Sequence, residues 1–473
     1  MSEVTDDVTE AAGSQISGGD APPSATLGAH LIRALRHRNY RLFYSGQIIS
    51  LVGTFLTQVA TLWLVYHITG SAYKLGIVGF AGQIPMFVLA PFAGVWGDRI
   101  NRQKLLVVTQ SLAMLQSFAL AYLALTKITV PEIVLLSICQ GVINAFDLPG
   151  RQAFLVEMVT DRTDLANAIA LNSTMVHGAR LFGPALAGLL IQQVGAGFCF
   201  LLDGLSYIAV IAALMAMRIQ PRPRPVKRSV ITEFADGFRY VWHFAPVRAL
   251  LILMAVFSLT GMPAFSILMP IFGEFFGGKE HSAQTFGFLM TASGGGALIG
   301  SIYLASRRTV IGLGRVIAFG AIVFGASLVA FSFSHHLWIS LMICPIAGCA
   351  MIITFASSNT LVQTFVEDSM RGRVMSLFTV SFMGMAPWGN LLAGQLATWF
   401  GHAHRSAVSS PVIGASHTLM IEGVICALVA INFARKLPAL RPIVRKLYVE
   451  RGILPPEIAS GIQVAAEVSE GGT

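Results

Sequence analysis

The segment GVWGDRINRQKLL, residues 94–106, separates two long apolar stretches. Residues 76–95 before it and 105–125 after it are almost continuously apolar. About 20 such residues cross the hydrocarbon core of a bilayer as one helix, at a rise of about 1.5 Å per residue. The segment is therefore predicted to be a short loop at one face of a membrane, and its cluster of cations indicates the cytoplasmic face.

The composition agrees with a protein embedded in lipid. Of 473 residues, 55% are hydrophobic and only 12% are charged, about half of the roughly 25% that soluble proteins carry. The net charge of +9 would suggest a nucleic-acid partner in a soluble chain. Here the cations cluster at the ends of apolar stretches, so we expect membrane lipid around the protein and no nucleic-acid partner.

The residue types that serve catalysis or metal binding do not stand at the spacings that such sites need. The five cysteines lie in apolar stretches without a C-x-x-C pair, and no histidine pair has metal-ligand spacing on a helix. GEFFGGKE at 273–280 has the glycines and Lys of a P-loop but ends in Glu280 instead of Ser or Thr. The chain is therefore predicted not to be an enzyme, and to bind no metal and no cofactor.

Apolar stretches of membrane length recur on both sides of a polar connector. They predict an all-α membrane protein with twelve transmembrane helices in two pseudo-symmetric six-helix bundles. The stretches cover about residues 42–66, 76–96, 104–126, 132–153, 168–192, 198–218, 249–272, 284–305, 315–334, 337–362, 374–400 and 412–434.

The positions of Lys and Arg predict the orientation. With both termini in the cytoplasm, 27 of the 32 cations fall on the inner side and four on the outer side, as the positive-inside rule requires. The polar N-terminus has no signal peptide. The predicted domains are a disordered cytoplasmic N-terminal tail (1–38), an N-terminal bundle (39–218), a cytoplasmic connector with helical spacing at 232–242 (219–247), a C-terminal bundle (248–435) and a cytoplasmic C-terminal tail (436–473).

The two halves resemble each other at an offset of about 206 residues. LVEMVTDRTDLANAIA at 155–170 aligns with LVQTFVEDSMRGRVMS at 361–376. Internal repeats of this kind are typical of transporters whose substrate site lies near the midplane, between two bundles. At the same offset, Gly183 and Gly188 align with Gly389 and Gly394.

The loop at 94–106 resembles the signature loop of the major facilitator superfamily, G-x-L-A-D-R-x-G-R-K-x-x-L. Asn101 replaces a glycine of that motif, and because Asn tolerates a left-handed backbone we expect the turn to persist. NYRLFYSGQIISLVG, FDLPGRQAFLVEMV and ARLFGPALAGLL resemble the enterobactin-exporter branch, also called the transmembrane secretion effector family. The resemblance implies a bacterial inner-membrane exporter of siderophores or drugs. The loop match covers Gly94, Asp98, Arg99, Arg102 and Leu106.

Polar residues follow one face of the first apolar stretch. Gln47, Ser50, Thr54, Gln58 and Thr61 have helical spacing. Lipid cannot hydrate them, so they face either a water-filled cavity or neighbouring helices. We interpret Gln47, Thr54 and Gln58 as cavity residues, with Gln58 near mid-span as the preferred substrate contact.

A second polar face lies on the fourth stretch, with Gln140, Asn144, Asp147 and Arg151. Asp147 and Arg151 are one turn apart and are predicted to pair, because an unpaired charge at that depth costs several kcal/mol. Asp147 then either carries a proton during transport or belongs to a static ion pair near the cytoplasmic mouth. Gln140 and Asn144 are further candidate cavity residues.

The fifth stretch places His177 and Arg180 on one face. Arg180 is costly in lipid without a partner, and Asp147 or a substrate anion could supply one. Arg180 is therefore predicted to bind an anionic group. His177 is either a proton carrier or a neutral, hydrogen-bonded histidine of the core.

Acidic residues elsewhere in the apolar stretches provide one further proton candidate. Glu422, in the twelfth stretch, either carries a proton or is a hydrogen-bonded structural carboxyl group. Asp203, near the outer end of the sixth stretch, is expected to be solvated.

Two motifs suggest the direction of transport and the position of a cytoplasmic gate. GPALAG resembles the antiporter motif through Gly183, Pro184 and Gly188, which implies export by antiport. Asp98 is predicted to bind the positive N-terminal end of the eleventh helix together with Arg371 or Arg373. That contact would close the cytoplasmic side, with Arg151 near it.

These observations predict a secondary active exporter of a small amphipathic molecule, a drug-like compound or a siderophore, driven by proton antiport with alternating access. An importer or a lipid or metabolite transporter of the same fold is the nearest alternative. A membrane scaffold or sensor that transports nothing is a further alternative. We expect a monomer in the bacterial inner membrane, with a small-molecule substrate and protons as its partners.

Overall fold

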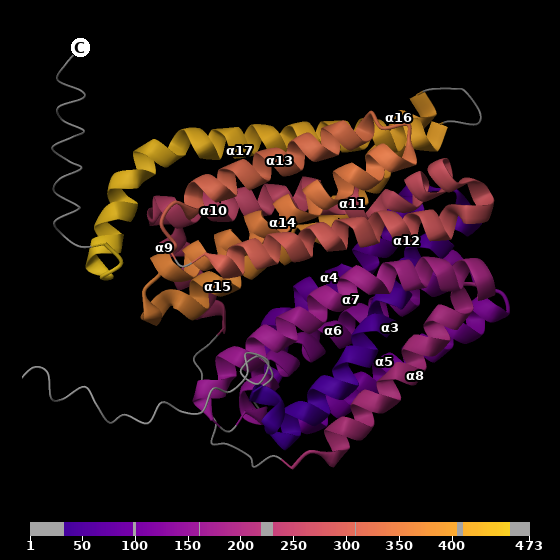
Figure 1. Cartoon of the computed structure of the whole chain (residues 1–473), viewed down its shortest axis with the longest axis horizontal. Helices are drawn as coiled ribbons and strands as arrows, with labels where there is room; N and C mark the ends of the chain where they lie inside the picture. Colours follow the sequence, from indigo (N-terminus) through magenta and orange to yellow (C-terminus); the bar gives the residue numbers. More distant parts are fainter. Residues whose placement is uncertain are drawn as a thin grey trace, which may run out of the picture.

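The structure is a computed structural model and describes residues 33–97, 101–159, 161–218, 230–307, 309–403 and 410–454. Every regular element in these ranges is a helix, and the helices form two stacked lobes (Figure 1). The N-terminal lobe contains η1 (Arg33–Arg36), α3 (Arg38–Thr69), α4 (Ala72–Gly97), α5 (Arg102–Leu125), α6 (Val130–Met158), η2 (Arg162–Asp164), α7 (Leu165–Val194) and α8 (Ala196–Ala216).

The C-terminal lobe follows a connector helix, α9 (Val230–His243), whose position agrees with the helical spacing of its sequence. Its first span is divided into short pieces, one of which is the π-helical turn η3. The lobe contains α10 (Ala245–Val256), η3 (Phe257–Gly261), α11 (Met262–Ile267), α12 (Met269–Ser306), α13 (Leu313–Ser332), α14 (Leu337–Phe365), α15 (Asp368–Met383), α16 (Ala386–Ala403) and α17 (Ser410–Glu450).

These helices make the predicted twelve spans. Ten stretches of the described chain are long and apolar enough to cross a membrane, and one of them, Ala245–Ser306, contains two spans. Gly278, with a φ of 63°, separates those two spans inside α12, since glycine alone adopts such a backbone readily. The remaining span is divided between α15 and α16. Sequence periodicity had indicated an unbroken helix there.

Local chemistry explains where several helices begin and end. Thr129 and Glu132 form a capping box at the start of α6, and Gly70 ends α3 in the left-handed region. Asn101 precedes α5 with a φ of −63°, and its side-chain oxygen accepts a hydrogen bond from the Lys104 N–H at 3.2 Å. The left-handed turn expected at Asn101 is therefore wrong, because the residue acts as an N-cap.

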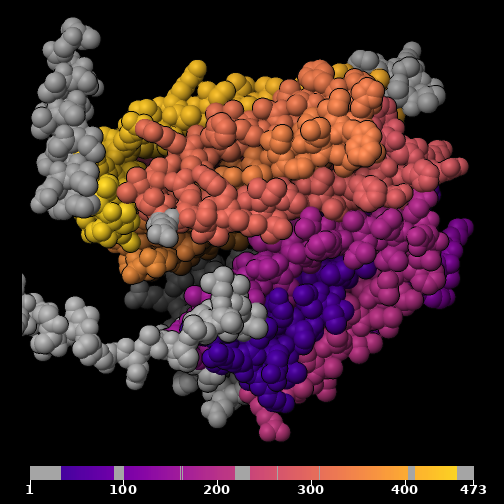
Figure 2. All heavy atoms as spheres, viewed as in Figure 1, coloured from indigo at the N-terminus to yellow at the C-terminus, as the bar shows by residue number. Residues whose placement is uncertain are grey.

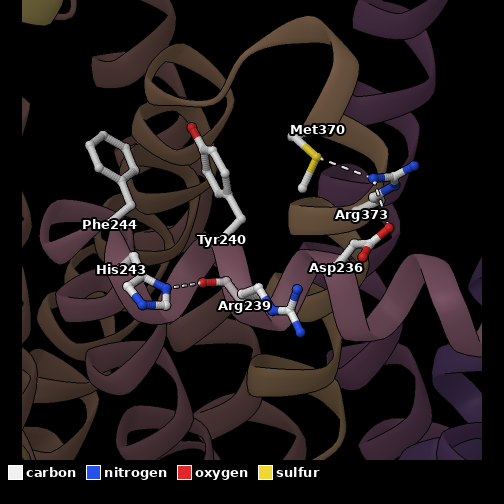
Figure 3. A pocket seen from close by; sticks show the side chains of 7 residues that line it. All are labelled: Asp236, Arg239, Tyr240, His243, Phe244, Met370 and Arg373. Carbon is white, nitrogen blue, oxygen red and sulfur yellow. Dashed lines mark hydrogen bonds and ion pairs between the residues drawn. The ribbon is translucent and has the colours of Figure 1, made fainter.

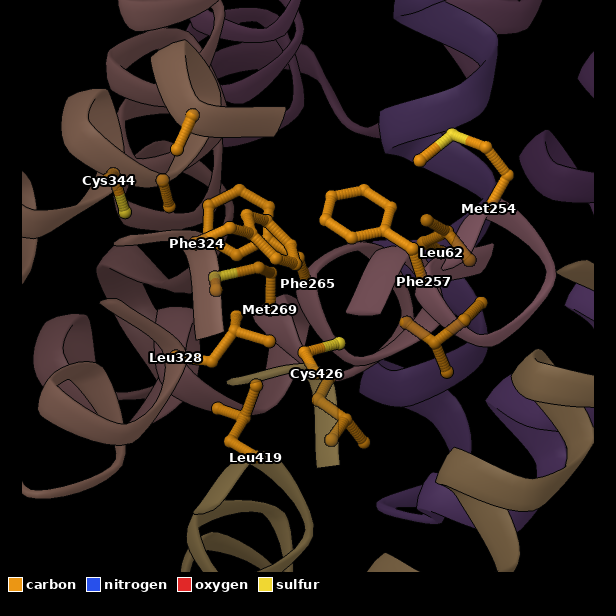
Figure 4. Close-up of a cluster of buried hydrophobic side chains, with 14 of the residues drawn as sticks. Leu62, Met254, Phe257, Phe265, Met269, Phe324, Leu328, Cys344, Leu419 and Cys426 are labelled. Atoms are coloured by element: carbon orange, nitrogen blue, oxygen red, sulfur yellow. The ribbon is translucent and has the colours of Figure 1, made fainter. Parts of the chain in front are cut away.

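Each lobe has an apolar interior, while large apolar side chains also cover the outward faces. This distribution is expected where the solvent is lipid, because a lipid-facing helix gains nothing from a polar surface. In the C-terminal lobe, Phe257, Phe324, Leu328, Leu419 and Cys426 bring η3, α13 and α17 together (Figure 4). The Phe257 and Phe324 rings are 4.6 Å apart between their centroids.

Glycines at the predicted offset of 206 residues occupy equivalent places in the two lobes. A Cβ atom at Gly183 would lie 2.5 Å from Phe55 Cβ of α3, and one at Gly389 would lie 2.5 Å from Pro263 Cγ of α11. Both glycines therefore let a helix approach the first span of its own lobe. This equivalence confirms the pseudo-symmetry that the sequence repeat indicated.

Short segments within both predicted tails, residues 33–38 and 436–450, are ordered in the described part of the chain. Ala34 of η1 is fully buried, and its N–H donates to Asn167 Oδ1 at 2.9 Å. The nearby loop is fixed as well, because the Thr163 N–H donates to Asp161 and lowers the pKa of that carboxyl group. At the other end, α17 continues to Glu450 and buries Tyr448. Residues 33–38 and 436–450, which the sequence assigned to the tails, thus pack against the lobes, and the domain bounds stay a prediction.

The packing of α12 on α14 predicts a strong effect of a single methyl group. A Cβ at Gly296 would collide with the backbone oxygen of Pro345, whereas nothing lies within 4 Å of a Cβ at Gly178. Gly296→Ala should lower the free energy of unfolding by about 1–3 kcal/mol through overpacking. Gly178→Ala should leave it unchanged or raise it, because alanine favours helices. Thermal unfolding of the detergent-solubilised variants measures both, and equal behaviour would contradict the packing.

Candidate functional site

The two lobes meet along two pairs of helices, α7 with α12 and α4 with α16, and we call this contact the seam. A Cβ at Gly188 would lie 3.2 Å from the Cα of Gly287, and one at Gly394 would lie 3.0 Å from the Cα of Gly76. The predicted repeat pair Gly188 and Gly394 therefore brings backbones of opposite lobes into direct contact. At the same end, the indole N–H of Trp63 donates to Ser282 Oγ across the lobes at 3.0 Å.

His177 and Arg180 lie where α7 faces α12. His177 Nε2 is 3.3 Å from Ser301 Oγ of α12, while its buried Nδ1 has no hydrogen-bond partner among the described residues. A Cβ at Gly294 of α12 would lie 2.7 Å from the backbone oxygen of Arg180. Both predicted residues are therefore half-buried at the seam itself.

The Arg180 guanidinium group has no ion-pair partner in the part of the chain that the structure describes. Asp147, which the sequence left open as its partner, is bound elsewhere. A cation at mid-span without a counter-ion is unfavourable in lipid. Arg180 is thus able to attract an anionic group that enters between the lobes.

Asp147 belongs to a hydrogen-bonded network inside the N-terminal lobe. It pairs with Arg151 as predicted, and it accepts hydrogen bonds from Thr109 Oγ1 at 2.9 Å and Gln110 Nε2 at 2.7 Å. The carboxyl group is almost fully buried. These three contacts hold the carboxyl group in one position, so the geometry matches the static ion pair better than a proton carrier.

The polar face of α3 is divided between the lobe interior and the protein surface. Gln47 and Ser50 are buried, whereas Thr54 and Gln58 are exposed. On α6, Gln140 Nε2 donates to Asn144 Oδ1 at 3.1 Å, and both side chains are partly exposed. Of the predicted cavity residues, only Gln47 is fully enclosed by protein.

Glu422 lies inside the C-terminal lobe, away from the seam. It is 2% exposed, and its Oε2 has no hydrogen-bond partner among the described residues. Four residues further along α17, Cys426 lies beside Thr260 at 3.1 Å. A buried carboxylate oxygen without a donor is unfavourable, so Glu422 stays a candidate to hold a proton.

The residues assigned to the cytoplasmic gate are paired within their own halves. Arg102 pairs with Glu157 at 2.5 Å, Arg371 with Asp368 at 2.5 Å, and Arg373 with Asp236 of α9 at 3.2 Å. Gly94 lies in α4, whereas Asp98 and Arg99 lie outside the described residues. The expected contact of Asp98 with Arg371 or Arg373 therefore stays a prediction.

The pair of Arg373 with Asp236 borders a cavity of about 470 Å³ between α9 and α15 (Figure 3). In Figure 3, the Arg373 guanidinium group reaches both Asp236 and the sulfur of Met370. The connector helix is thereby attached to the beginning of the eleventh span. The sequence marked α9 as a surface helix but did not indicate this contact.

Asp203 was expected to be solvated, and this is wrong. It is 1% exposed and accepts hydrogen bonds at 2.8 Å from Thr57 of α3 and Ser117 of α5. A Cβ at Gly53 would lie 2.6 Å from its second oxygen. Small and polar residues of three separate helices create this site. In the sequence, only Thr57, one turn after Gly53, could have indicated it.

A family model for transmembrane secretion effectors matches residues 31–444 of this chain. The chain belongs to the transmembrane secretion effector family. Relatives include the staphyloferrin A transporter of Staphylococcus aureus, 25% identical over 76% of this chain and 90% of the relative. The multidrug efflux pump Tap of Mycolicibacterium fortuitum is 27% identical over the same shares. Macrolide efflux protein A of Streptococcus pyogenes is 23% identical over 84% and 96%.

Solved structures show that this family member has the fold of the major facilitator superfamily. A bacterial homologue of the lysosomal transporter Spinster superposes with a TM-score of 0.65 at 15% identity, covering 84% of this chain and 96% of that one. A D-xylose–proton symporter gives 0.64 at 11%, over 83% and 97%. The chain is accordingly a multi-pass membrane protein and a transporter, not an enzyme.

The Asp147 network predicts a large difference between two Asp–Arg pairs. Asp147→Ala leaves the half-buried Arg151 without its counter-ion, removes the acceptor of Thr109 and Gln110, and should cost about 3–5 kcal/mol in unfolding free energy. The control Asp368→Ala breaks the pair with Arg371, in which the aspartate side chain is 84% exposed, and should cost less than about 1 kcal/mol. Unfolding in detergent measures both, and a similar cost for the two variants would contradict the burial argument.

Proposed function

We propose that this protein is a secondary active exporter of a small amphipathic molecule, a drug-like compound or a siderophore, which it moves out across the bacterial inner membrane in exchange for protons. The names of its relatives, two kinds of efflux pump and a siderophore transporter, support this assignment. The observation that carries it is Arg180, whose backbone lies at mid-span on the seam and whose guanidinium group has no counter-ion among the described residues.

The substrate site of this proposal lies between the lobes and is bordered by Arg180, His177 and the exposed part of the α3 face. Arg180 binds an anionic group of the substrate, because a charge-assisted hydrogen bond is strongest where water is scarce. Thr54 and Gln58 supply neutral hydrogen-bonding groups that suit a polar part of the same molecule. Gln140 and Asn144 extend this polar lining on α6.

Transport proceeds by rocking of the two lobes around that site. Gly188 and Gly394 support this step, because helix backbones that meet at glycines pack closely and can separate without a rearrangement of side chains. We place both termini in the cytoplasm, so the glycine contacts close the outer side. Asp98 and the N-terminal end of α15 would close the inner side in the opposite state.

Arg180→Gln should weaken efflux of anionic substrates about tenfold or more, because it removes an interaction worth about 1.5–3 kcal/mol. Arg180→Lys keeps the charge and should retain most of the activity. Uptake of matched anionic and neutral compounds into inverted membrane vesicles measures the effect, because an exporter moves its substrate into their lumen. Equal losses for both kinds of compound would contradict an anion site, and flux in the opposite direction would favour an importer.

Glu422→Gln should separate transport from its driving force. Glutamine resembles the protonated carboxyl group, so exchange of labelled for unlabelled substrate should persist while accumulation driven by a pH gradient is lost. His177→Gln tests the second candidate in the same assay, and Asp368→Asn is an exposed control. If accumulation depends on the pH gradient in every variant as in the wild type, neither residue carries the coupled proton.

A further inference from the structure

The end of the C-terminal lobe carries a cavity that the transport cycle described above does not use. It measures about 1170 Å³ and lies where α13 begins, α14 ends and α17 continues past the lobe. Figure 1 shows α17 running along the lobe and bending over this end, and its helix contains Pro438 and Pro442 in that region. Proline bends a helix by removing a backbone hydrogen bond.

The bent part of α17 is held in place over the cavity. The Tyr448 hydroxyl group donates to the backbone oxygen of Val310 at 3.4 Å, and its ring lies 6.0 Å from that of Phe365, between centroids. Tyr448 is buried, although it lies well beyond the apolar part of the last span. The cavity is therefore a built feature between α17 and the ends of α13 and α14. Figure 2 shows this end of α17, in yellow, at the edge of the lobe.

The floor and the rim of the cavity differ in chemistry. Leu250, Leu361, Phe365, Phe433 and Leu437 give it an apolar floor. The rim carries four cations and one acid, and one of the cations, Lys446, lies 4.0 Å from that acid, Glu450. The cations are Arg315, Arg441, Arg445 and Lys446.

This combination selects one class of ligand. A soluble anion would leave the apolar floor in contact with water. A neutral apolar compound would make no ionic contact with Arg315 or Arg441. A molecule with acyl chains and an anionic phosphate headgroup satisfies both parts. The cavity also lies at the end of the last span, which is the level where lipid headgroups meet the protein.

We propose that this cavity binds an anionic phospholipid, with the phosphate at Arg315 and Arg441 and the acyl chains on the Phe365 and Phe433 side. The lipid connects the α17 extension to α13, and it belongs to the leaflet that surrounds this end of the bundle. The site is independent of substrate export. Binding can therefore be measured without transport.

The test uses the full-length protein in mild detergent, titrated with phosphatidylglycerol and followed by native mass spectrometry and thermal unfolding. Arg315→Gln combined with Arg441→Gln should weaken lipid binding about 30-fold. That factor converts to about 2 kcal/mol, at about 1.4 kcal/mol for each tenfold change and about 1 kcal/mol for each cation. The control pair Arg435→Gln with Lys436→Gln removes the same amount of charge from α17 outside the cavity, and should change binding less than threefold.

Three further ligands show which part of the lipid the cavity recognises. Phosphatidylcholine with the same acyl chains, inorganic phosphate and glycerophosphoglycerol should each bind at least tenfold more weakly than phosphatidylglycerol. Equal binding of phosphatidylcholine, equal binding of a headgroup without chains, or equal losses in both variant pairs would overturn the proposal. It would also be overturned if lipid bound only after truncation at residue 454, because the chain's own C-terminal residues would then be the occupant.

Discussion

Direct backbone contact between α7 and α12, and between α4 and α16, unites the two lobes. Each contact depends on a glycine from both sides, and the two contacts are related by the internal repeat. Because lipid supplies no hydrophobic force between helices, close van der Waals packing has to provide the attraction. The remaining architecture follows from this constraint, since the polar residues of α7 then lie between the lobes and the apolar faces of the other helices meet lipid.

The buried charges fall into two groups with different surroundings. Asp147 and Arg151 satisfy each other together with Thr109 and Gln110. Asp203 stands between the groups, because one of its oxygens is held by Thr57 and Ser117 while the other has no partner among the described residues. Arg180 and the second oxygen of Glu422 have no such partners among the residues described. A saturated network stabilises one arrangement of a lobe, whereas an unsatisfied group gains from a change in its surroundings. The proposed binding and coupling roles therefore rest on the second group.

Sequence reasoning predicted the fold in detail because lipid imposes long apolar helices, whose length and number can be read directly. The repeat offset was also correct, since Gly183 and Gly389, and Gly188 and Gly394, occupy equivalent positions. Burial near helix ends was harder to predict. Asp203 is enclosed by residues of α3 and α5 that are distant in sequence, and Arg373 pairs with Asp236 of the connector helix, a contact that the sequence did not indicate. The break between α15 and α16 was missed, although Gly384 and Pro387 lie beside it in the sequence.

The π-helical turn η3 lies in the seventh span, between α10 and α11, and changes which side of the helix beyond it faces the neighbouring helices. One additional residue in a turn rotates everything beyond it by about 100° relative to an uninterrupted α-helix. Beyond the turn, the Pro263 ring lies against Gly389 of α16, and within the turn Ser258 donates to the backbone oxygen of Phe382, just before α15 ends. The two interrupted spans thus meet at their irregular points. If η3 were one residue shorter, a different side of α11 would face α16. The side of α11 that faces α16 is therefore determined by the additional residue in η3 and not by the hydrophobic pattern.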